Sequence, residues 1–117
     1  MMSNAYLAVT ALTIAANVAI GVADLRRAEF VLHNSARVGV APSLLPLLAA
    51  LKIAGAAGLI AGLLGVRPLG LAAAAGLVLF FVGAVASHVR ARVYDNIAFP
   101  LSYLALAVAT FVLDVLR

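Results

Sequence analysis

The composition of this 117-residue chain excludes a water-soluble fold, because 67% of its residues are hydrophobic, only 10% are charged and the mean hydropathy is +1.21. Soluble domains are about half apolar and about one quarter charged, so lipid is the expected solvent. The formal charge of +4 comes from a few basic residues at the ends of apolar segments, as in membrane proteins, and this excludes nucleic acid as a partner.

Four apolar segments follow one another along the chain, and each is long enough to cross a bilayer. About 20 residues, rising about 1.5 Å each, span the hydrocarbon core. We therefore predict an all-α fold, an integral membrane four-helix bundle with short loops that forms a single transmembrane domain over residues 1–117. The predicted spans are residues 5–23, 44–66, 69–87 and 97–113.

The segments between the spans predict how the helices are connected. Residues 30–41 are more polar and are expected to form a short helix at the membrane interface. Arg67 and Pro68 form a very short link, which makes the second and third spans antiparallel neighbours. Gly58 and Gly62 lie four residues apart, so we expect them to pack these two spans together. A homodimer that uses the same small residues is the alternative.

Arginines predict the orientation and the location of the protein. The loops after the first and third spans share one side of the membrane and contain Arg26, Arg27, Arg37, Arg90 and Arg92. By the positive-inside rule this side faces the cytoplasm, and both termini lie outside. The expected location is the inner (plasma) membrane, which the chain crosses several times.

Lys52 is an anomaly within the second span. A charged side chain inside a span costs about 2.5–3.5 kcal/mol on insertion scales, and it normally faces the bundle interior with a partner. Asp24, after the first span, and Asp95, before the fourth, are the candidate partners. We expect Lys52 to belong to a functional site, with a purely structural ion pair or a snorkelling side chain as the alternatives.

Other polar residues share the half of the membrane that contains Lys52. Measured from the arginine-rich side, Asn17 and Tyr103 lie about 10 Å deep and Lys52 about 15 Å deep. The opposite half is expected to be almost purely Ala, Leu, Val and Gly. This distribution predicts a pocket that opens on the arginine-rich face, with Lys52 at its floor. The candidate catalytic residues are Asp24, Lys52 and His88, and the candidate substrate-binding residues are Asn17, Arg90, Asp95, Asn96 and Tyr103.

Several chemistries are excluded by the residues present. The chain has no cysteine, so it has no disulfide and no thiol redox chemistry. Zinc ligands at a useful spacing are lacking, and we expect no metal site. Haem held between two histidines would need both of them in the bundle, whereas His33 is expected in a loop. Ser87 and His88 are adjacent, so their side chains do not face each other as a hydrolase requires.

Three stretches, residues 39–46, 51–62 and 75–91, carry a family resemblance. The most specific piece is the Gly-Ala-x-x-x-His-x-Arg-Ala sequence that ends at Ala91. On these residues the chain resembles the DoxX-like family of small four-helix membrane proteins, over roughly residues 21–91 and more loosely over the last span. Members often carry a lysine shortly after the glycine of the first span, where this chain has Asp24.

The resemblance implies a bacterial membrane protein, and the family is associated with quinone-linked sulfur oxidation and with oxidative-stress complexes. The first functional hypothesis is therefore a redox-associated membrane subunit that binds a quinone or another lipid-like small molecule. Lys52 or His88 would donate a hydrogen bond to a carbonyl oxygen of the ligand. Electrons would come from a redox partner protein, because the chain has no cysteine.

The alternative hypothesis is a membrane-embedded isomerase, cyclase or epoxide-opening enzyme that acts on an apolar substrate. Asp24 or Asp95 would be the acid, and His88 or Tyr103 the proton acceptor. A small dimeric exporter ranks lower, because residues 5–23 contain no carboxylate. A purely structural subunit would need no pocket at all.

Overall fold

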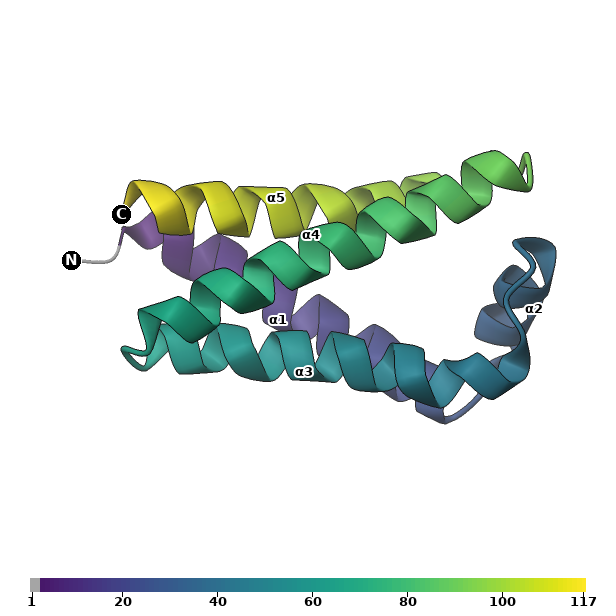
Figure 1. The fold of residues 1–117 in the computed structure, drawn as a ribbon, viewed down its shortest axis with the longest axis horizontal. Coiled ribbons are helices and arrows are strands. Elements are labelled where there is room, and N and C mark those ends of the chain that lie inside the picture. The colour runs from purple at the N-terminus through teal and green to yellow at the C-terminus, as the bar shows by residue number, and fades with distance from the viewer. Residues whose placement is uncertain (1–2) are drawn as a thin grey trace.

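The chain folds into long helices that run side by side, with one short helix across an end (Figure 1). A computed structural model describes residues 3–117. Its elements are α1 (Asn4–Leu25), α2 (Glu29–Arg37), the 3-10 turn η1 (Pro42–Leu44), α3 (Leu45–Leu63), α4 (Arg67–Arg90) and α5 (Ala98–Leu116). Four segments are long and apolar enough to cross a membrane: α1, η1 together with α3, α4 and α5. The all-α, four-span prediction is confirmed.

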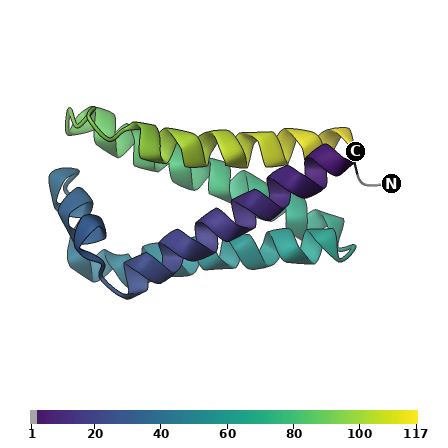
Figure 2. The same cartoon turned by 180° about the vertical axis from the view of Figure 1, so that it is seen from behind.

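The two ends of the bundle are built differently. The start of α1, the α3–α4 turn and the end of α5 lie together, and we call this the terminal end; α2 and the α4–α5 loop lie at the other, the α2 end (Figures 1 and 2). The molecule is 43 Å long, close to the thickness of a bilayer with its headgroups, about 40–45 Å. The bundle can therefore cross a membrane along its long axis.

Helices α1 and α4 run diagonally between α3 and α5, so neighbours differ between the ends (Figures 1 and 2). At the terminal end α4 packs on α3, and Thr13 of α1 bonds to Thr110 of α5. At the α2 end Gly21 of α1 packs against Ile53 of α3, and the Phe81 ring of α4 lies 5.2 Å from a tyrosine ring of α5. The α1–α3 and α4–α5 pairs therefore diverge at the α2 end.

Glycines bring α3 and α4 into close contact at the terminal end. A Cβ atom on Gly62 would lie 2.7 Å from the Cα of Gly70, and one on Gly58 would lie 2.6 Å from the Cβ of Ala73. Small residues permit such an approach, and van der Waals packing then holds the helices together. The prediction that Gly58 and Gly62 pack the second and third spans against each other is confirmed.

The helix ends differ from the predicted ends by one to three residues, and two of these differences change how the chain is described. The link between the second and third spans is formed by Leu64 to Val66, where Gly65 has a φ of +110°, and Arg67 and Pro68 already belong to α4. Proline suits the first turn of a helix because its missing N–H is not needed there. The first helix continues to Leu25, two residues beyond the predicted end, which brings Asp24 into α1.

Helix α2 covers the α2 end of the bundle, and the short helix expected in residues 30–41 is confirmed. It is attached to the start of α5 and the preceding loop by three contacts. Asn96 Nδ2 donates to Asn34 Oδ1 at 2.8 Å, and the Phe30 and Phe99 rings lie 6.5 Å apart. Arg37 forms the third contact, a two-bond pair with Asp95 at 2.6 and 2.9 Å.

Candidate functional site

A cavity of about 480 Å³ lies at the α2 end, and residues from α1, α2, α3, α4 and α5 line it. Its walls are mostly aliphatic and aromatic, and Phe80 and Phe99 are among the ring side chains that line it. The polar side chains around it are Asp24, Asn34, Ser35, Lys52, Ser87, His88, Asn96 and Tyr103. The volume suits one small organic molecule.

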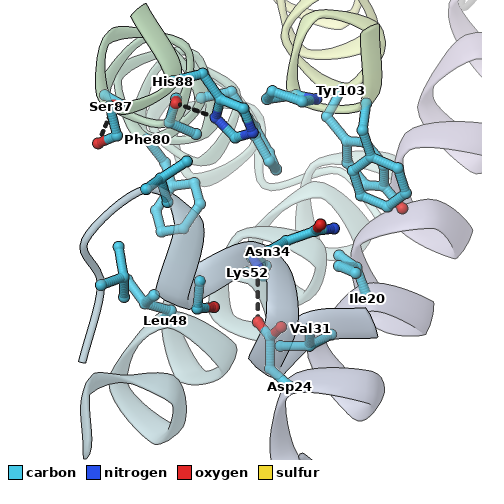
Figure 3. A pocket seen from close by; sticks show the side chains of 18 of the residues that line it. Ile20, Asp24, Val31, Asn34, Leu48, Lys52, Phe80, Ser87, His88 and Tyr103 are labelled. Carbon is cyan, nitrogen blue, oxygen red and sulfur yellow. Dashed lines mark hydrogen bonds and ion pairs between the residues drawn. The ribbon is translucent and has the colours of Figure 1, made fainter. Parts of the chain in front are cut away.

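An ion pair lies on one side of this cavity (Figure 3). Lys52 Nζ donates to Asp24 Oδ2 at 2.6 Å, and the two side chains are 10% and 3% exposed. The Lys52 ammonium also lies 5.3 Å from the centre of the Phe80 ring. Neither charge could be buried alone in lipid at an acceptable cost, so each stabilises the other.

The helical spacing explains how Asp24 and Lys52 reach each other. Asp24 lies in the last turn of α1 and Lys52 two turns into α3. The two helices approach closely because Gly21 lacks a side chain where a Cβ would lie 2.8 Å from Ile53. Lys52 has two protons left to donate after the bond to Asp24, and it lines the cavity.

His88 and Tyr103 bring acid–base and hydrogen-bonding groups to the opposite wall (Figure 3). His88 Nδ1 lies 2.9 Å from the carbonyl oxygen of Ala84, and a carbonyl only accepts, so Nδ1 carries the proton. Nε2 is then the acceptor of the ring. The Tyr103 hydroxyl donates to the Ala16 carbonyl at 3.0 Å, and its ring stacks on Phe99 with centroids 5.3 Å apart.

The structure brings five of the eight predicted site residues together around the cavity: Asp24, Lys52, His88, Asn96 and Tyr103. The other three lie elsewhere. Asn17 is fully buried inside the bundle, does not line the cavity, and donates to the Thr13 carbonyl at 2.9 Å. Arg90 is exposed at the end of α4.

Asp95, the third of these residues, lies on the surface. Its carboxylate pairs with Arg37, and both groups are largely solvated. The hydrogen bonds from Arg37 lower the pKa of Asp95 below its ordinary value of 3.8, and the nearby positive charges of Arg37 and His33 add to this effect. The pair connects α2 to the loop before α5 and does not line the cavity.

Sequence reasoning missed the aromatic and amide residues of the cavity, above all Phe80, Phe99 and Asn34. The sequence does contain a pattern that indicates Phe80. Phe80, Ala84 and Ser87 follow the helical spacing of four and three residues, so they lie on one face of α4 beside His88. The position of Asn34 depends on how α2 packs, and no local pattern indicates it.

The expectation that the opposite half is almost purely apolar is wrong. Five polar side chains in the terminal half of the bundle are fully buried: Tyr6, Thr10 and Thr13 of α1, and Thr110 and Asp114 of α5. Their spacings of three and four residues place them on one face of each helix, which turns toward the partner helix.

Within residues 3–117 no group of three or more His, Cys, Asp or Glu side chains could hold a metal ion.

The comparisons with known proteins give the chain a family. No protein of curated function and no solved structure matches it. A model of the DoxX-like family, however, matches residues 8–110, which cover the second and third spans, most of the first and fourth, and every polar residue that lines the cavity. This chain is therefore a multi-pass membrane protein that belongs to the DoxX-like family.

Proposed function

We propose that this protein binds a quinone, or a similar lipid-like molecule with a carbonyl-bearing ring, as the membrane subunit of a redox system in the inner (plasma) membrane. The observation that carries the proposal is an apolar cavity of about 480 Å³ with a buried lysine ion pair in its wall. Apolar walls with a few converging polar groups are typical of small-molecule sites. A ligand that already dissolves in lipid reaches such a cavity without crossing water.

The side chains around the cavity suit the two parts of such a ligand. Phe80, Phe99 and Tyr103 offer ring faces and edges to a flat ring. Lys52 Nζ can donate a hydrogen bond to a carbonyl oxygen while it keeps its bond to Asp24. A redox partner protein would then supply or accept the electrons, because the chain has no cysteine.

Two glycines of α4 allow a matched test of the cavity. Gly83 lines the cavity and Gly76 does not, and a Cβ atom on either would meet nothing within 4 Å. Gly83→Phe should fill the cavity and lower the affinity for a short-chain ubiquinone analogue at least tenfold, measured by titration calorimetry of the detergent-solubilised protein. Gly76→Phe should bind as the wild type does. No binding to the wild-type protein, or equal binding by both variants, would contradict the proposal.

The enzyme alternative, a membrane-embedded isomerase, cyclase or epoxide-opening enzyme, is supported by one observation. Asp24 and His88 line the same cavity, so a carboxylate and a proton acceptor could reach one substrate. Asp24 Oδ2 already accepts a hydrogen bond from Lys52, so the other carboxylate oxygen of Asp24 would be the one that meets a substrate. Mass spectrometry of molecules that copurify with the protein separates the two functions: a quinone supports the binding subunit, and an epoxide or cyclised terpenoid supports the enzyme.

A further inference from the structure

A column of polar side chains runs through the core of the bundle from the terminal end toward the cavity. It consists of Tyr6, Thr10, Thr13 and Asn17 on α1, with Thr110 and Asp114 on α5, and we call it the α1 column. All six residues are 0% exposed. The column belongs neither to the cavity nor to any contact with the lipid.

Most of the unsatisfied polar atoms of the molecule lie in this column. Five buried side-chain oxygen or nitrogen atoms have no hydrogen-bond partner within residues 3–117, and four of them are Tyr6 Oη, Thr10 Oγ1, Asn17 Oδ1 and Asp114 Oδ2. Each such group destabilises the fold if nothing bonds to it. Native proteins satisfy the great majority of buried polar groups, and buried water bonds to groups that no protein atom reaches.

The spacing of the column fits a file of water molecules. Successive α1 side chains are three or four residues apart, so they are separated by about 4.5–6 Å along the helix. One water that makes two hydrogen bonds bridges about 5.5 Å. Direct bonds complete the file, because the Thr13 and Thr110 hydroxyls lie 2.9 Å apart.

Both ends of the column have an outlet. At the terminal end Asp114 Oδ1 accepts from Arg117 Nε at 2.6 Å, and Arg67 donates to the Asp114 carbonyl at 2.9 Å. The Arg67 side chain is 46% exposed, so this cluster meets the surface. At the inner end Tyr103 bonds to the Ala16 carbonyl, next to Asn17, and Tyr103 also lines the cavity.

We propose that the α1 column is a hydrated proton path that connects the surface at the terminal end with the cavity. A proton from water enters at Asp114 Oδ2, which has no hydrogen-bond partner, while Oδ1 of the same carboxylate accepts from Arg117 and lies 3.8 Å from Arg67. It then moves by exchange of O–H bonds through water and the column's hydroxyls.

Each group of the path has a role that its chemistry allows. Hydroxyls both accept and donate protons, whereas the Asn17 amide only orients water through its free Oδ1. In the cavity, His88 Nε2 can take up the proton, because Nδ1 already carries one. Nothing is oxidised or reduced, and the path does not depend on which ligand fills the cavity.

Proton flux into liposomes tests the path directly. The full-length protein is reconstituted, a potassium diffusion potential is set with valinomycin, and internal pH is followed with pyranine. Wild-type liposomes should change pH at least threefold faster than protein-free liposomes. Thr10→Val, which keeps the side-chain shape, and Asp114→Asn should each bring the rate close to the protein-free rate.

Ser102→Ala is the matched control, because this exposed hydroxyl on α5 bonds only to the Ala98 carbonyl of its own helix. It should retain the wild-type rate. A wild-type rate equal to that of protein-free liposomes would overturn the proposal, and so would full flux in both Thr10→Val and Asp114→Asn.

Hydration of the column can be measured without any flux. The chain has three threonines, Thr10, Thr13 and Thr110, and all of them belong to the column. Threonine labelling therefore reports on the column alone in water-edited solid-state NMR of the protein in bilayers. We expect threonine signals to gain magnetisation from water at least threefold faster than leucine methyls at exposed, lipid-facing positions such as Leu12, which does not line the cavity. Equal build-up would show a dry column and would refute the path.

Discussion

The two ends of the bundle bury charge in different ways. At the α2 end, Asp24 and Lys52 neutralise each other beside an apolar cavity, and both side chains are at most 10% exposed. At the terminal end, Asp114 is fully buried and pairs with Arg117 at 2.6 Å, and its second arginine partner, Arg67, is 46% exposed. The α2 end thus pairs two buried side chains, whereas the ion pairs of the terminal end extend to the surface through Arg67. The helices have similar compositions, yet they enclose a cavity only at the α2 end. At the terminal end, Gly62 and Gly70 let α3 and α4 pack closely.

Breaking the pair at the α2 end should have the largest effect on stability. Lys52→Met leaves Asp24 buried without a partner, and such a loss costs about 3–5 kcal/mol. We expect this decrease in the free energy of unfolding, measured by circular dichroism during titration of detergent micelles with a denaturing detergent.

The double variant Asp24→Asn/Lys52→Met separates the cost of an unpaired charge from the value of the pair. It removes both charges, so most of the stability should return. If the double variant is as unstable as Lys52→Met, the two side chains are not coupled in the way that the 2.6 Å contact implies.

Closing space at the terminal end should have the next largest effect. Gly62→Val introduces a Cβ where the Gly70 Cα would be only 2.7 Å away, and both atoms belong to helices that cannot move apart freely. Overpacking of this kind costs about 1–3 kcal/mol. The matched variant Gly76→Val has open space at the Cβ and should stay near wild-type stability. Similar losses in both variants would point to glycine itself, rather than the α3–α4 contact.

The smallest effect is expected where charge is solvated, at Arg37 and Asp95 over the α2 end. Because the bonds from Arg37 lower the pKa of Asp95, the pair stabilises the fold above pH 3.8 and loses this contribution as the pH falls through the lowered value. Asp95→Asn should therefore melt slightly below the wild type at neutral pH, and the difference should vanish in acid. A difference that grows in acid would contradict this assignment.

Hydropathy was sufficient to predict the architecture of this protein. Lys52 also indicated the cavity end, because a charge within an apolar span must find a partner in the bundle. Asp24 was one of its two candidate partners, and the structure selects it because α1 continues through Asp24. Asp95 was the other candidate. It lies outside the cavity because it pairs at the surface with Arg37 of α2.

The α1 column shows where reasoning on the sequence stopped short. Thr10 and Thr13 are hydrophobic enough to pass within an apolar span, and only their spacing with Tyr6 and Asn17 marks a common face. Asp114 follows the predicted fourth span directly and lies close to Arg117, so the sequence indicated a residue at the membrane surface. Its complete burial depends on α4 and α1 closing over it.

The amino-acid sequence alone determined the helices, the turns and the lipid environment of this protein. The length of each apolar segment and the positions of proline and glycine act within one segment of the chain. The crossing of α1 and α4 decided the rest. Close contact between Gly62 and Gly70 brings α3 and α4 together at the terminal end, and the divergence of the helix pairs leaves a cavity at the other. Which buried polar groups meet across helices depends on this packing, and no single segment of the chain contains that information.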